Sequence, residues 1–130
     1  MPRVEVTGGH RTGSVAVNDG EWHHIAIVFA AGGNITSATI YVDGVEDTGG
    51  SSTSRAVDTA SSIDVLIGKG AAGGATHFDG AIDDIRIYSR ALTAQDINAL
   101  VLLGDQGAIL QPETHALTFP LNYSLTYGVN

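Results

Sequence analysis

The alternation of apolar and polar positions predicts a chain built from short β-strands. Paired valines between residues 4 and 17, separated by glycine-bearing polar stretches, predict two short strands. Residues 21–29 carry β-branched and aromatic side chains on both faces, which is typical of a strand covered on both sides. Residues 63–67 and 77–88 predict two further strands next to glycine-rich stretches. The pattern therefore favours an all-β fold.

A tight hairpin is predicted where Asp43 and Gly44 separate the β-prone residues 38–42 from Val45. Both central positions of a type I′ turn need positive φ, and Asp-Gly is one of the pairs that adopt it most readily. The strands on either side of this pair are therefore expected to be antiparallel neighbours.

Residues 47–62, rich in glycine and small polar residues, predict a long exposed loop or a weak edge strand, and residues 68–76 predict a second, glycine-rich loop. Loops of this length often carry function. Within the predicted strand 77–88, a β-bulge is expected at Asp83 and Asp84, because the isoleucines that flank this pair lie on opposite faces of the strand.

One short helix is predicted over residues 93–103. Thr93 is a suitable N-cap, and Asp96 lies in the first turn, where a carboxylate interacts favourably with the helix N-terminus. Apolar side chains recur at helical spacing at Ile97, Leu100 and Val101. The helix is expected to pack against an end of the β-structure.

The end of the chain has the strictest alternation. Apolar residues occupy every second position from 117 to 129, which predicts one long half-buried strand. Pro120 either places this strand at a sheet edge or puts a break in it, because proline has no N–H to donate. We expect it to pack on its own or a neighbouring subunit. The expected homo-oligomer interface consists of Leu117, Phe119, Leu121, Tyr123, Leu125 and Tyr127.

Composition fits one globular domain, since the 130 residues include 43% hydrophobic residues and 17 glycines. The net charge is −8 and the basic residues are scattered singly, which disfavours nucleic-acid binding and is compatible with calcium or neutral sugars. There is no cysteine, which excludes disulfides and thiolate zinc sites. No apolar run approaches the roughly 18 residues of a membrane span, and no signal peptide is visible.

Four segments resemble, in the same order, the signatures of one family. They are DGEWHHIAIV at 19–28, IYVDG at 40–44, LIG at 66–68 and FDGAIDDIRIYSRALT at 78–93. Over about residues 15–103 the chain resembles laminin-G-like, concanavalin-A-like lectin and glucanase domains. The resemblance implies an antiparallel β-sandwich of the jelly-roll type over residues 1–103, followed by a C-terminal extension over 104–130.

The resemblance also implies that strands are missing. Domains of this family usually have several strands before the segment that matches 19–28, and this chain has room for about two. An incomplete sandwich exposes a sheet edge and an apolar face. The amphipathic strand predicted at 117–129 is a suitable complement for both.

A calcium site is expected at Asp79, Asp83 and Asp84, because domains that this chain resembles often hold one calcium ion, and a hard cation prefers oxygen ligands. A structural alternative stays open. In it, Asp79 forms a turn with Gly80 and the two adjacent carboxylates accept hydrogen bonds from the backbone.

Ligand contacts are expected at Tyr41, His77 and Tyr88, because sugar sites combine aromatic faces with short polar groups. The exposed loops are the expected contact surface. Trp22 and the two histidines that follow it are expected to be structural, with the indole packed in the core and the imidazoles bonded to nearby polar groups.

Catalysis is not expected. Glycoside hydrolysis needs two carboxylates that flank the scissile bond, and the Glu-x-Asp-x-x-Glu arrangement of hydrolases in the family is absent from the sequence. No nucleophile elbow or phosphate-binding loop occurs either.

Two functions remain open. The first is a carbohydrate-binding or adhesion module that recognises a glycan or another surface ligand. The second is a structural assembly protein, such as a phage virion decoration or fibre component, that oligomerises through its C-terminal strand or binds capsid proteins. Both imply an extracellular or particle-surface location, without membrane insertion.

Overall fold

The computed structural model describes residues 1–29, 32–57, 65–70 and 77–105. Within these ranges the chain is mostly β-structure, in two antiparallel sheets of three strands each. The first sheet has the order β1-β2-β6, with β1 at Arg3–Val6, β2 at Gly9–Thr12 and β6 at Ser52–Thr53. The expected antiparallel β-sandwich class is confirmed.

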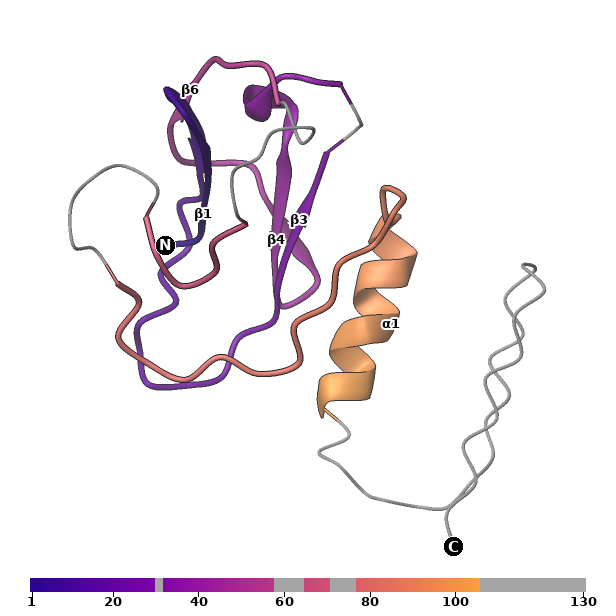
Figure 1. Cartoon of the computed structure of the whole chain (residues 1–130). Helices are drawn as coiled ribbons and strands as arrows, with labels where there is room; N and C mark the ends of the chain where they lie inside the picture. The colour runs from indigo at the N-terminus through magenta and orange to yellow at the C-terminus, as the bar shows by residue number, and fades with distance from the viewer. Residues whose placement is uncertain (30–31, 58–64, 71–76, 106–130) are drawn as a thin grey trace, which may run out of the picture.

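The second sheet has the order β3-β4-β5 and contains the predicted hairpin. Its strands are β3 at Ile25–Val28, β4 at Thr39–Val42 and β5 at Val45–Asp47. Asp43 and Gly44 have φ values of 52° and 81°, the positive values that the tight turn requires. Figure 1 shows β1 and β6 on one side of the domain and β3 and β4 on the other.

The core of the described residues lies around β4. A short 3-10 helix, η1 at Ile35–Ser37, precedes this strand, and the Asn34 side chain caps it by accepting from the Thr36 N–H. The sheet face, η1 and the C-terminal helix enclose one set of fully or nearly fully buried apolar side chains. These are Ile35, Ala38, Ile40, Val42 and Ile97.

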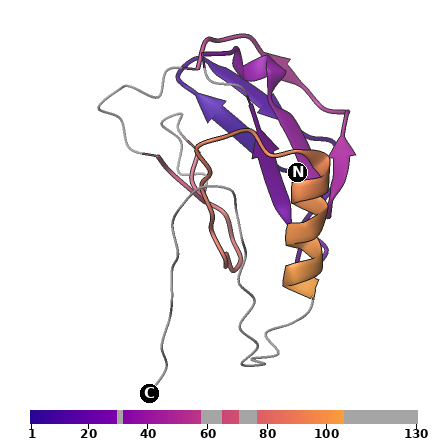
Figure 2. The ribbon, with the colours of Figure 1, turned by 90° about the vertical axis from the view of Figure 1, so that its right-hand side faces the viewer.

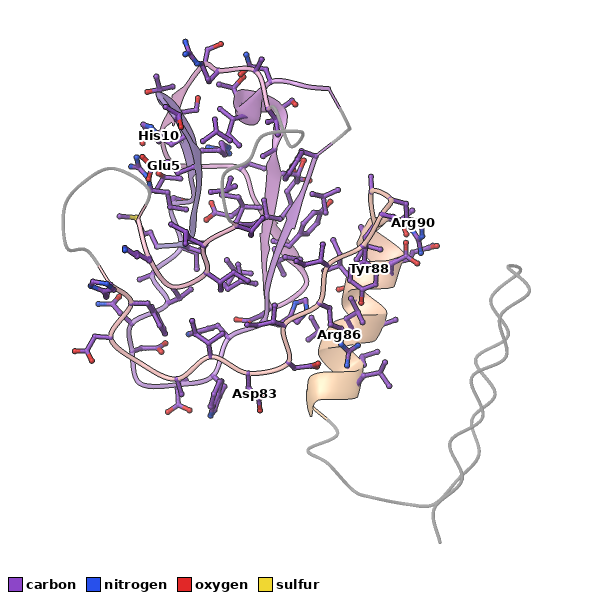
Figure 3. The ribbon with its side chains drawn as sticks, in the orientation of Figure 1. Glu5, His10, Asp83, Arg86, Tyr88 and Arg90 are labelled. Atoms are coloured by element: carbon purple, nitrogen blue, oxygen red, sulfur yellow. The ribbon has the colours of Figure 1, made fainter. Side chains whose placement is uncertain are left out.

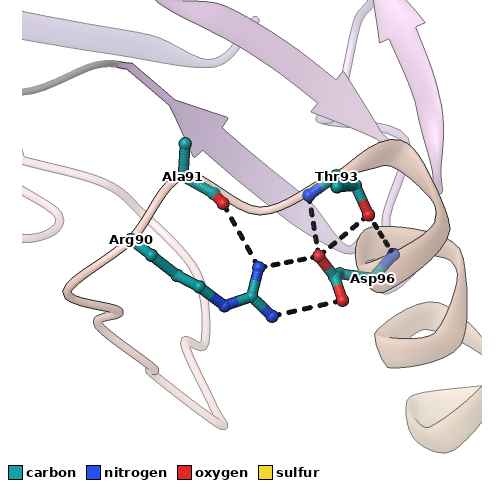
Figure 4. A network of polar contacts seen from close by, with 4 residues as sticks. All are labelled: Arg90, Ala91, Thr93 and Asp96. Atoms are coloured by element: carbon teal, nitrogen blue, oxygen red, sulfur yellow. Dashed lines mark hydrogen bonds and ion pairs between the residues drawn. The ribbon is translucent and has the colours of Figure 1, made fainter.

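The predicted helix is confirmed as α1 at Ala94–Asp105. Thr93 and Asp96 form a reciprocal cap: the Thr93 N–H donates to the Asp96 carboxylate over 2.8 Å, and the Asp96 N–H donates to the Thr93 hydroxyl over 3.2 Å (Figure 4). Arg90 donates to both oxygens of Asp96. Bonds from Arg90 and Thr93 hold the pKa of Asp96 well below its usual value. None of the helices in the described ranges is long and apolar enough to cross a membrane.

Two strand predictions differ from the structure. The segment 77–88 is irregular apart from a bridge between Lys69 and His77, so the predicted strand and its bulge are wrong, although Asp84 does adopt a positive φ of 50°. A strand needs a neighbour to complete its hydrogen bonds, and no sheet of the described part includes this segment. Residues 65–67 are likewise irregular, and 63–64 lie outside the described residues. The predicted strand at 117–129 also lies outside them.

Candidate ligand-binding site

A polar loop before β3 forms the centre of the candidate site. Asp19 accepts a hydrogen bond from the Glu21 N–H over 3.0 Å, and Gly20 between them has a φ of 92°. This bond closes an Asx turn, in which an aspartate side chain takes the place of a backbone carbonyl. The turn fixes the start of the segment that carries Trp22, His23 and His24.

His23 joins this loop to the β4–β5 turn. Its Nδ1 lies 2.8 Å from the Asp43 carboxylate and its Nε2 lies 3.0 Å from the Asp19 carboxylate. Carboxylates only accept hydrogen bonds, and a neutral imidazole has a single N–H, so His23 makes both bonds in its protonated form. Asp43 also accepts from the His24 N–H over 2.8 Å, and its own N–H donates to the His24 carbonyl over 2.9 Å.

The positive charge of His23 and the negative charges of Asp19 and Asp43 stabilise one another. The bonds to Asp43 and Asp19 raise the pKa of His23. The Glu21 N–H and then His23 lower the pKa of Asp19. Burial raises the pKa of Asp43, but the bonds from His23 and the His24 N–H outweigh it and the net pKa is lowered. Both carboxylates are therefore held ionised.

The neighbouring His24 is partly buried, and its pKa is shifted in the opposite direction from that of His23. Burial lowers its pKa, Asp43 and Asp84 act in the opposite direction, and Arg86 adds to the lowering. Its Nδ1 is buried and has no hydrogen-bond partner among the described residues. The charges of Asp84 and Arg86 therefore lie close enough to act on the His24 ring.

Trp22 is exposed, with 69% of its surface accessible, so the expectation that it packs in the core is wrong. The apolar pattern of residues 21–29 indicated burial on both faces, but regular β3 pairing begins only at Ile25, three residues after the indole. Trp22 is the candidate binding residue that sequence reasoning missed. The available signal was its position among Asp19, Glu21 and His23, a polar setting that a core tryptophan rarely has.

The three predicted ligand residues do not form one cluster. Tyr41 is half-buried within β4 and pairs with Ala26 of β3. His77 and Tyr88 are exposed at the two ends of the irregular segment 77–88. No hydrogen bond among the described residues joins the three, and their role in binding stays a prediction.

A family model of the concanavalin A-like lectin/glucanases superfamily matches residues 2–98. This chain belongs to that superfamily. The match includes β1 and β2, which the resemblance seen over about 15–103 had left out.

One solved structure is similar to this superfamily member: an S-layer domain-containing protein (residues 221–444) from Clostridium thermocellum ATCC 27405. It is 23% identical over 71% of this chain, with a TM-score of 0.49. The chain spans 44% of the length of that structure. No curated protein matches the sequence.

Two of the three aspartates expected to bind calcium, Asp83 and Asp84, accept hydrogen bonds from nearby groups in this superfamily domain, and Asp79 is exposed. Asp84 accepts from Arg86 through both carboxylate oxygens, over 2.9 and 2.8 Å, and Asp83 accepts from the Asp84 N–H over 2.7 Å. Figure 3 labels Asp83, Arg86 and Tyr88 along the trace that leads to α1. In the described part of the chain, no three or more histidines, aspartates or glutamates are grouped as a metal site would need. The calcium site stays a prediction.

Proposed function

We propose that this domain is a non-catalytic binding module at an extracellular or particle surface, and that it recognises a carbohydrate through Trp22. The observation that supports this most is the exposed indole on a loop whose conformation is fixed by the bonds from His23 to Asp19 and Asp43. An aromatic face covers the apolar C–H side of a sugar ring at low entropic cost when its loop is already ordered.

The polar groups beside Trp22 suit sugar hydroxyls. Asp19 and Asp43 are exposed carboxylates, and each has acceptor capacity beyond its bond to His23. Hydrogen bonds from hydroxyls to ionised acceptors are stronger than those between neutral groups. The loop before β3 and the β4–β5 turn that His23 joins to it therefore offer an aromatic stacking face and two charged acceptors.

The same electrostatics argue against hydrolysis. A glycosidase needs one carboxylic acid that keeps its proton near neutral pH, which requires a raised pKa. The pKa values of Asp19 and Asp43 are lowered instead. Neither group holds a proton that it could donate to a leaving sugar, so binding without bond cleavage is the favoured function.

A glycan array followed by isothermal titration calorimetry tests this proposal. Trp22→Ala should weaken binding to the selected glycan at least about tenfold, as truncation of a buried aromatic contact does. Val45→Ala is the matched control, because Val45 is an exposed apolar residue on the neighbouring hairpin, and it should bind like the wild type. Equal affinity of the Trp22 variant, an array without any binding, or shortened glycan products after incubation would contradict the proposal.

Assembly into a particle, such as a virion, is a second candidate function. The observation that favours it is a set of exposed apolar side chains on residues 65–67 and 78–87. Large exposed apolar patches mark interaction surfaces.

A further inference from the structure

The described part of the chain exposes one extended apolar surface, which we call the 65–87 surface. Val65 and Ile87 are its most exposed members, at 79% and 80%. Its residues are Val65, Leu66, Ile67, Phe78, Ile82, Ile85 and Ile87. Together they expose apolar area on the order of several hundred Å², which is at the upper end for a monomeric protein.

Backbone contacts hold the two segments of this surface together near Gly68. The Phe78 N–H donates to the Gly68 carbonyl over 2.8 Å, and Lys69 and His77 form an antiparallel bridge. Ile82 lies close to Gly68, since a Cβ built on this glycine would lie 3.0 Å from the isoleucine Cδ1. Figure 2 shows the salmon trace of these segments to the left of the strands and of α1.

The segment 77–88 of this surface lies outside the regular sheets of the described residues. A strand that is added beside an exposed segment supplies main-chain hydrogen bonds and side-chain contacts together, as strands added at a sheet edge do. A suitable partner is therefore an amphipathic segment with apolar residues at every second position.

We propose that residues 117–129 of the same chain lie on the 65–87 surface as an edge strand and complete the sandwich. This segment has seven apolar residues on one parity, which gives it one continuous apolar face if it is extended. Extended, it spans about 43 Å, and the twelve residues 77–88 span at most about 40 Å, at roughly 3.3 Å per residue. Pro120 lies on the other parity and is tolerated at an edge.

The distance along the chain favours docking within one molecule. Helix α1 ends at Asp105, so eleven residues, 106–116, precede the segment. They can reach about 36 to 40 Å, and a domain of this size has a radius of gyration of about 13 Å. A tether of this length gives an effective concentration on the order of millimolar, well above the concentration of a second copy in dilute solution.

Hydrogen exchange with mass spectrometry on the full chain tests the inference, with native mass spectrometry as a second measurement. In the wild type, the amides of 77–88 and 117–129 should exchange at least about tenfold more slowly than those of an unstructured chain, and the protein should be monomeric. The double substitution Leu121→Asp with Leu125→Asp should remove protection from both segments. Asn122→Asp with Thr126→Asp adds the same charge on the other face and should leave both protected.

Three outcomes would overturn the inference: fast exchange of 117–129 in the wild type, unchanged protection of 77–88 in the apolar-face variant, or a dimer that loses its contact in that variant. The dimer would instead favour strand exchange and the assembly function. If the apolar-face variant unfolds throughout, crosslinking between introduced cysteines tests the inference instead. The chain has no cysteine of its own, so only the introduced ones would react. In the double variant Ile85→Cys with Leu121→Cys, a short bis-maleimide should link the two cysteines within one chain. In the control variant Val45→Cys with Leu121→Cys, it should not. A link in the control variant and none in the first would reject the inference.

Discussion

Asp47 provides the sharpest test of how this fold is held together. It is the last residue of β5, and only 4% of its surface is exposed. Its carboxylate accepts from the Ser14 hydroxyl over 2.6 Å, and from the N–H groups of Ser14, Val15 and Gly49 over 2.7, 2.9 and 3.1 Å. These bonds connect the end of β5 in the second sheet to the residues that follow β2 of the first sheet and to Gly49.

The four bonds lower the pKa of Asp47, and this shift gives the size of the stabilisation by the ionised carboxylate. The Ser14 hydroxyl and then the Val15 N–H lower the pKa of Asp47 from 3.8 to about 2. Each pKa unit corresponds to about 1.4 kcal/mol, so the ionised carboxylate stabilises the folded state by about 2.5 kcal/mol at most. Because the folded pKa is depressed, this contribution is present above about pH 4, the unfolded pKa, and is lost as the pH falls toward 2.

Asp47→Asn keeps the shape of the side chain and removes its charge. At pH 7 the free energy of unfolding should fall by about 2 kcal/mol. Near pH 2 the deficit should become smaller, because about half of the wild-type carboxylate is then protonated in the folded state. Urea unfolding at both pH values measures this, and Glu46→Gln, an exposed neighbour, is the control with little expected effect. A deficit at pH 7 that is absent, or that is unchanged at low pH, would refute the assignment of the stabilisation to the charged form.

Two further predictions concern the β4–β5 turn. Asp43→Asn keeps a residue that accepts the positive φ of 52°, so the hairpin should persist while the pKa of His23 falls; an NMR titration of the ring that finds this pKa unchanged would contradict the bond to Asp43. In the wild type, the raised pKa means that His23 contributes its stability below about pH 6.5 and loses it as the pH rises through the folded pKa. Gly44→Ala should lower the melting temperature by about 4 to 8 °C or more, because φ is 81° and the new methyl would meet the Asn98 side chain. A thermal melt equal to the wild type would show that α1 does not pack closely against this turn.

Local signals in the sequence predicted the local structure well. Asp43 and Gly44 specify a turn whose geometry depends on these two residues, and the structure has the expected positive φ values. Thr93 and Asp96 likewise specify the start of α1, because an N-cap bond closes within three residues. In both cases the chemistry that fixes the backbone lies within a few positions along the chain.

Features that depend on distant partners could not be predicted in the same way. An apolar pattern indicates that a face will be covered, but it does not say which segment covers it. The sequence predicts a core position for Trp22 and a strand at 77–88, and in the described part of the chain the indole is exposed and the segment is irregular. His23 was expected to satisfy nearby polar groups, but its two partners, four and twenty positions away, could not be identified from spacing alone.

The two proposals rest on different kinds of interaction and can fail separately. The Trp22 loop is fixed by hydrogen bonds among Asp19, His23 and Asp43, all of which are complete without residues 117–129. The 65–87 surface, in contrast, consists of apolar side chains that the described residues leave exposed. A chain in which the tail does not dock would still present the indole on an ordered loop, and a chain that binds no glycan would still need a cover for its apolar face. The carbohydrate proposal therefore depends on charge and local hydrogen bonding, whereas completion of the sandwich depends on burial of apolar area.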